Sequence, residues 1–228
     1  MNSVERWLVF SLAQYRRALD MLVPISAPWA QVTLYYSSFY AANAVLGMFG
    51  GWIGHSKTGI RVVDVESGVA GSQELRIYRK FRSPSGATGS HRVFWDVFYD
   101  ATASISAWAP ADLASALDPV NNDFAWQINE RNNVNYDMFH AWATSTHFHG
   151  TFHPAKLASL NGPPALQLEK TEQMIKLGLY FAKEVSLQGT ALTGCGTTGT
   201  RLQQQKRLVT RAAPNLVSQS ELSTLLEM

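Results

Sequence analysis

The chain has 228 residues, of which 46% are hydrophobic and 16% are charged, and its formal net charge is +2. This composition excludes a wholly disordered protein, and the length suits one domain, or one domain with an appendage. The small net charge gives no argument for nucleic-acid binding, which therefore has to rest on local patches. The single cysteine, Cys195, excludes an intrachain disulfide and favours a reducing, cytoplasmic compartment.

Two apolar helices are predicted at the start of the chain. Residues 3–22 carry hydrophobic side chains at helical spacing and end before Pro24. Charged residues interrupt this apolar stretch, so we do not expect a signal peptide there. A second helix is expected from Pro28, a favourable first-turn residue, to the glycines at 50 and 51.

The second helix lies in a stretch without charge, residues 21–54, which is long enough to span a membrane. Prolines and amide side chains within it favour instead a helix buried at the centre of a bundle or in a dimer interface, and we expect no membrane span. Gly47 and Gly51, four residues apart, would let another helix approach closely.

A β-hairpin, or a pair of short extended arms, is predicted as an insertion over about residues 58–82, because residues 60–65 and 75–81 alternate between apolar and polar side chains. Basic residues gather in and after its second arm, with no acid between Glu74 and Asp96: Arg76, Arg79, Lys80, Arg82 and Arg92. Tyr78 and Phe81 lie among them and could stack on bases, so this is the candidate nucleic-acid-binding patch. The alternative is a solvated basic hairpin that discourages strand pairing at its edge.

The remaining helices complete a mainly α fold. They are expected over residues 90–108, 122–144 and 165–188, which gives a bundle of four to five long helices within residues 1–188. Residues 189–228 are expected to form a flexible Gly/Thr-rich stretch followed by short C-terminal helices.

The helix predicted over residues 122–144 contains five asparagines, although asparagine is a mediocre helix former. On one continuous helix, Asn132, Tyr136 and His140 share a face, next to Arg131. A guanidinium beside amides and a phenol can bind a phosphate through paired hydrogen bonds. The alternative is structural: Arg131 forms a local ion pair, for example near Glu130 or Asp137, while the asparagines bridge helices.

Arg131-Asn132, followed by an aromatic residue at 136, resembles the motif helix of the HEPN superfamily. The aromatic, small-residue phrase from Leu34 to Ala42 and the apolar helix around residues 174–181 are similar to other parts of the same superfamily. The resemblance implies a HEPN-like helical bundle that forms a homodimer, with a composite RNA-cleaving site that needs no metal ion and no cofactor.

The resemblance also implies a role for each residue of the motif. Arg131 would bind the scissile phosphate and Asn132 would orient it. Tyr136 stands where catalytic members have a histidine that assists attack by the ribose 2′-hydroxyl. Tyrosine has an unperturbed pKa near 10 and is a poor general base at neutral pH. His140, one turn further on, could substitute for the missing histidine or hydrogen-bond the phenol.

Three functions stay open at this stage. The first is a ribonuclease of a toxin or antiviral (phage) defence type, with RNA as substrate and a cognate antitoxin or defence protein as partner. The second is a non-catalytic HEPN-like module that binds RNA, a nucleotide or a protein. The third is a helical scaffold without a ligand.

Histidines 147, 149 and 153 are close enough in sequence to bind zinc or copper. Because no cysteine or carboxylate accompanies them, we predict a loop with incidental histidines and no metal site. The chain contains no P-loop, no dinucleotide-binding glycine motif and no nucleophile elbow, so nucleotide hydrolysis and acyl transfer have no support.

Overall fold

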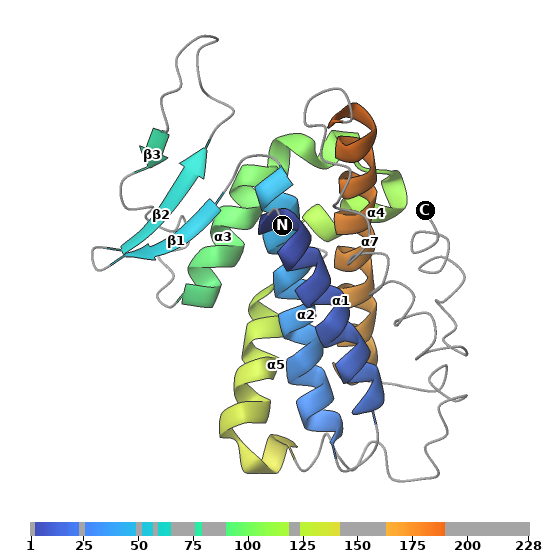
Figure 1. Ribbon diagram of the computed structural model, residues 1–228. Helices are drawn as coiled ribbons and strands as arrows, with labels where there is room; N and C mark the ends of the chain where they lie inside the picture. Colours follow the sequence, from blue (N-terminus) through green and yellow to red (C-terminus); the bar gives the residue numbers. More distant parts are fainter. Residues whose placement is uncertain are drawn as a thin grey trace.

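Helices form most of the molecule in the computed structural model, which describes residues 3–22, 26–48, 52–56, 59–64, 76–78, 90–118, 124–141 and 163–189. The long helices are α1 (Ser3–Asp20), α2 (Ala27–Met48), α3 (Ser90–Thr102), α5 (Phe124–Tyr136) and α7 (Pro163–Gly189). Shorter turns follow α3: η1 (Ala103–Trp108), α4 (Ala111–Ala114) and η2 (Ser115–Leu117) (Figure 1). The prediction of a mainly α-helical fold is confirmed for these residues.

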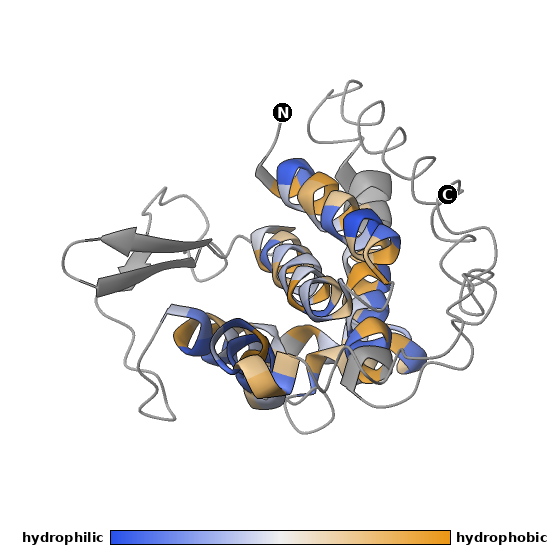
Figure 2. Cartoon of the chain, turned by 90° about the horizontal axis from the view of Figure 1, so that it is seen from below, coloured by the Kyte–Doolittle hydropathy of each residue, from blue (hydrophilic) through white to orange (hydrophobic). Residues whose placement is uncertain are grey.

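The central helix is α2, which packs against α1, α5 and α7. Seen along the helices in Figure 2, α1 and α7 lie on one side of α2 and α5 lies on the other. Since α2 contains no charged residue, it can be buried on several sides at once. Among the described helices, none is both long and apolar enough to cross a membrane.

Small residues let the helices approach closely. A Cβ atom at Gly47 of α2 would lie 3.0 Å from Val4 Cγ2 of α1, and one at Gly178 of α7 would lie 3.1 Å from Leu8 Cδ2. Gly47 therefore allows the close approach of a helix that its sequence position predicted. Gly51 lies outside the described residues.

Buried polar contacts join α1 to both α2 and α7. Ser11 Oγ donates to the carbonyl of Ser37 at 2.8 Å, and Ser37 Oγ donates to the carbonyl of Ser11 at 2.7 Å. Between α1 and α7, the Tyr15 hydroxyl donates to Glu172 Oε1 at 2.6 Å. Burial, together with the nearby Glu172 carboxylate, raises the pKa of Tyr15 well above its usual value.

A small antiparallel sheet lies to one side of the helices, between α2 and α3 in the chain (Figure 1). Its strands are β1 (Trp52–Ser56), β2 (Gly59–Asp64) and β3 (Arg76–Tyr78), in that order, with Ile53 opposite Val62 and Val62 opposite Tyr78. β2 and β3 fall within the two arms expected to be extended. β1 was not predicted, because a strand that contains Gly54 and follows two glycines lacks the β-branched alternation of the other two.

The helix that carries the motif is interrupted, which corrects the prediction of one helix over residues 122–144. α5 ends at Tyr136, and a further helical turn spans residues 138–141. Asp137 Oδ1 accepts hydrogen bonds from the backbone N–H groups of Phe139 at 2.9 Å and His140 at 3.2 Å. These are the bonds of a helix N-cap, so Asp137 starts a new turn instead of continuing the old one.

Candidate functional site

Arg131, on α5, is held by one contact to α2 and one within α5. Its Nη2 donates to the Tyr36 hydroxyl at 2.7 Å, and its Nη1 donates to Asn132 Oδ1 at 2.8 Å. The central carbon of the guanidinium lies 5.5 Å from the centre of the Tyr36 ring, which is a cation–π distance. The Nε atom is buried and has no hydrogen-bond partner among the described residues. The guanidinium is therefore oriented by the protein itself.

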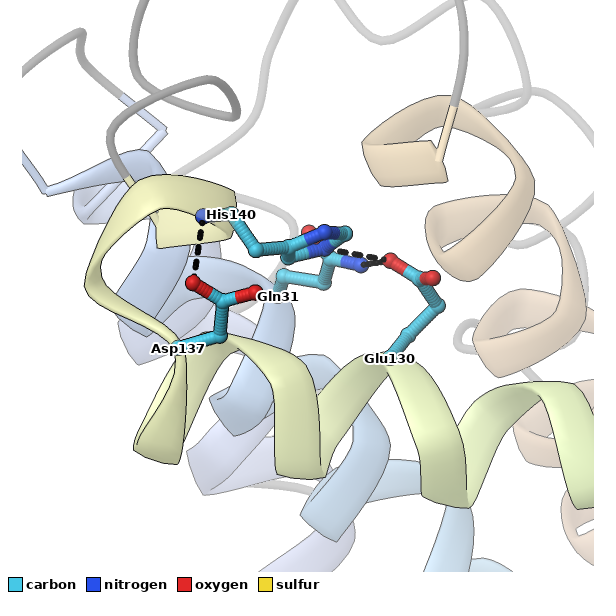
Figure 3. A network of polar contacts seen from close by, with 4 residues as sticks. All are labelled: Gln31, Glu130, Asp137 and His140. Atoms are coloured by element: carbon cyan, nitrogen blue, oxygen red, sulfur yellow. Dashed lines mark hydrogen bonds and ion pairs between the residues drawn. The ribbon is translucent and has the colours of Figure 1, made fainter.

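The carboxylates nearest to Arg131 in sequence are engaged elsewhere. Glu130 Oε2 accepts a hydrogen bond from Gln31 Nε2 at 3.0 Å and lies 3.0 Å from His140 Nε2 (Figure 3). Asp137 caps the turn after α5. Within the described residues, Arg131 forms no ion pair, so the local ion pair considered as an alternative is not found there.

The interrupted helix separates the residues that a continuous helix would have aligned. His140 turns back over the end of α5 toward Glu130, as Figure 3 shows. Tyr136 is 82% exposed. The structure thus brings Arg131 and Asn132 together, places His140 on Glu130, and leaves Tyr136 at the surface.

Sequence reasoning did not connect Tyr36 or His91 with Arg131. His91, near the start of α3, lies with its ring 5.9 Å from the ring of Tyr36, and its Nδ1 is 2.8 Å from the Tyr35 hydroxyl. That hydroxyl also accepts a hydrogen bond from Trp95 Nε1 at 3.3 Å. Burial raises the pKa of Tyr35 above its usual value, so the hydroxyl stays protonated at neutral pH.

The predicted basic patch is placed only in part. Arg92, exposed on α3, donates from Nη2 to Asn129 Oδ1 on α5 at 3.2 Å, so it lies beside the motif helix. Arg76 is in β3, and only its backbone is described. Arg79, Lys80 and Arg82 lie outside the described residues. One arginine of the patch therefore lies next to the helix that carries Arg131.

The predictions about metals and the C-terminal region fall mostly outside the described residues. Histidines 147, 149 and 153, Cys195 and all residues after 189 are in this category. Among the residues that are described, no group of three or more His, Cys, Asp or Glu side chains could hold a metal ion.

The site is therefore an oriented arginine of α5 that contacts Tyr36 of the central helix α2, next to His91 of α3.

Comparison with known protein families, curated proteins and solved structures found no match to this chain.

Proposed function

We propose that this chain is a HEPN-like protein that forms a homodimer and cleaves RNA without a metal ion, as a toxin or phage-defence effector. The helical bundle would be HEPN-like, and residues 58–82 would be a hairpin inserted into it. The observation that carries the proposal is the guanidinium of Arg131, which Tyr36 and Asn132 hold in place without a carboxylate partner among the described residues.

This arrangement suits phosphate binding. A guanidinium has five N–H donors, and the bonds to Tyr36 and Asn132 use one on each terminal nitrogen. Each terminal nitrogen keeps a second N–H that can donate to a phosphate oxygen. An arginine fixed before the substrate arrives can stabilise the charge that develops on the phosphate during attack by a 2′-hydroxyl.

The proton-transfer half of the reaction would involve Tyr136 at the surface of each copy. Tyr136, the last residue of α5, and Met138 and Phe139, in the turn that follows, are all exposed. An apolar surface of this kind suits burial against a second copy, and a dimer formed there would bring the end of α5 from one copy toward the other.

A second function, a non-catalytic module that binds RNA, a nucleotide or a protein through Arg131, is favoured by one observation. Tyrosine is a poor general base at neutral pH, and the imidazole of His140, in the turn after α5, is already bound to Glu130. In that case Arg131 would hold a phosphate without turnover.

The two functions are separated by incubating purified protein with total RNA and with tRNA in the presence of EDTA. The wild type is compared with Arg131→Ala and with Arg131→Lys, which keeps the charge but loses the planar fork. Cleavage by the wild type that Arg131→Ala abolishes and Arg131→Lys strongly reduces supports the ribonuclease. Cleavage that Arg131→Ala leaves unchanged rejects the proposed site. RNA binding that depends on Arg131, without cleavage, supports the binding module.

A further inference from the structure

The side of α2 that is only half-buried is aromatic and uncharged. Most of its side chains that are not fully buried recur every three or four residues and so follow one stripe of the helix: the exposed Trp29 and the half-buried Thr33, Tyr36, Tyr40 and Asn43. α2 contains no Asp, Glu, Lys or Arg. The stripe therefore presents ring and amide surface without a charge of its own.

Two rings from α1 pack against this surface, and Arg131 lies over the Tyr36 ring at its other end. Trp7 stacks on Tyr40 with ring centres 5.6 Å apart and an angle of 20° between the planes, and Phe10 lies 5.8 Å from the same ring. Tyr40 is followed by Tyr36 at 6.4 Å, and Tyr36 carries the guanidinium of Arg131. We call the exposed Phe10 and the half-buried Trp7, Tyr40 and Tyr36 the aromatic track. Each ring is within 6.4 Å of the next, and the track ends at the proposed phosphate-binding arginine.

The charges beside the aromatic track are mostly basic. Arg6 and Arg17 are exposed on α1, four and seven residues from Phe10, and so share its side of the helix. Glu5 is buried, and the exposed acids Asp20 and Asp137 lie where α1 and α5 end. The track thus combines stacking surface with cations that complement a phosphate backbone.

We propose that the aromatic track is a platform for single-stranded RNA, whose unpaired bases stack on Phe10 and its neighbouring rings while the backbone reaches Arg131. The inference rests on the proposed function for the identity of the ligand and goes beyond it by naming the strand state and the path. Stacking on aromatic side chains tolerates any base, since every base has a π-face. Bases within a duplex are already stacked and paired, so the track selects unpaired strands.

A second copy of the chain fits this face less well. A twofold interface places the same patch on both partners. Arg6, Arg17 and Arg131 of one copy would then approach the same arginines of the other, with few acids between them. RNA supplies the negative charge that such an interface lacks.

The test measures binding of labelled 2′-O-methyl oligouridine, which has no free 2′-hydroxyl to attack the phosphate, by fluorescence anisotropy. The same protein is titrated with an oligonucleotide of equal length that carries abasic positions, and with a duplex of equal length. Phe10→Ala removes a ring that is 49% exposed, so the fold should tolerate it. Phe10→Tyr restores a ring at the same place. Trp108→Ala removes another exposed ring, on η1 and outside the track.

The wild type is expected to bind the single strand more tightly than either the abasic strand or the duplex. Phe10→Ala should weaken single-strand binding by about five-fold or more, which is the low end of the effect of removing one base–aromatic stack. The variant should bind the abasic strand as the wild type does, because the ring it lacks has no base to stack on. Phe10→Tyr and Trp108→Ala should bind the single strand as the wild type does.

Three results would overturn the inference. The first is a duplex bound as tightly as the single strand, and the second is unchanged binding by Phe10→Ala. The third is a wild-type dimer that Phe10→Ala converts to a monomer in sedimentation, because a second copy would then cover the track. Cleavage is scored separately from binding. Cleavage by the wild type with unchanged binding by Phe10→Ala rejects the platform alone, whereas binding through Phe10 without cleavage supports the platform and rejects the ribonuclease.

Discussion

The hydrogen bond between Arg131 and Tyr36 allows a direct test of whether the guanidinium is held in place. Tyr36→Phe removes the hydroxyl that accepts from Arg131 Nη2 at 2.7 Å but keeps the ring beneath the guanidinium. Hydrogen bonds to charged groups contribute about 1.5–3 kcal/mol when buried. Because both side chains are only partly buried, we expect Tyr36→Phe to lower the free energy of unfolding by about 1–2 kcal/mol, which reaches below that range.

The assay is a double-mutant cycle with Arg131→Gln, in which urea denaturation at neutral pH gives the free energy of unfolding of each variant. The coupling between the two positions should be about 1–2 kcal/mol, since the second substitution has nothing left to remove once the first is made. Tyr40→Phe is the matched control, because Tyr40 lies one turn further along α2 and its ring, not its hydroxyl, makes the contacts described above. Its coupling with Arg131→Gln should be within about 0.5 kcal/mol of zero.

A Tyr36–Arg131 coupling as small as that of the Tyr40 control would refute the reasoning. The guanidinium would then be no better held by Tyr36 than by solvent, and the claim that it is oriented before a phosphate binds would fail. The proposed function would lose the observation that carries it, even if RNA still bound elsewhere on the surface.

Three further predictions concern stability, and urea denaturation tests each of them. Glu130→Ala leaves Gln31 Nε2 and His140 Nε2 without their shared acceptor, and should lower the free energy of unfolding by about 2–3 kcal/mol, whereas Glu130→Gln keeps an acceptor oxygen and should cost less. The pKa values of Tyr15 and Tyr35 are raised in the fold, so above pH 10 the unfolded chain loses protons that the folded chain retains. The stability that these two tyrosines contribute is fully present below pH 10 and is lost as the pH rises toward their folded pKa values. Tyr35→Phe should therefore make the free energy of unfolding fall less steeply with pH. An unchanged slope between pH 9 and 11 would contradict this. Gly178→Val would place side-chain atoms against Leu8, since a Cβ alone would lie 3.1 Å from Leu8 Cδ2, and should cost about 1–3 kcal/mol, while an equally stable variant would mean that α7 can move away from α1.

The main helices could be predicted because their apolar residues recur at helical spacing and prolines or glycines mark their ends. α7 was expected over residues 165–188 and spans Pro163–Gly189. The interruption after α5 could not be predicted in the same way. Asp137 followed by Met138 and Phe139 reads as a continuing amphipathic helix, and only the structure shows that these two side chains are exposed and that Asp137 caps a new turn.

The candidate site could be predicted only as far as local sequence reaches. Arg131 and Asn132 are neighbours in the chain, so their association follows from the motif helix. Tyr36 is 95 residues from Arg131, and no periodicity relates the two positions. The contact exists because α5 packs on the central helix, and that choice among helix pairs is made by the whole core. The contact with Tyr36, which orients Arg131 for binding, therefore cannot be predicted from the spacing of residues in the sequence.

The interruption at Asp137 also changes the chemistry that a single copy can perform. A continuous helix would have placed Tyr136 and His140 in one row beside Arg131, with the phosphate-binding group and a proton acceptor in the same chain. The described residues instead divide these roles: Arg131 is oriented on Tyr36, His140 is bound to Glu130, and Tyr136 is exposed. If the protein is a ribonuclease, the exposed phenol has to act where a second copy approaches it, and cleavage should depend on dimer formation. If the protein only binds RNA, the oriented arginine is sufficient within one copy.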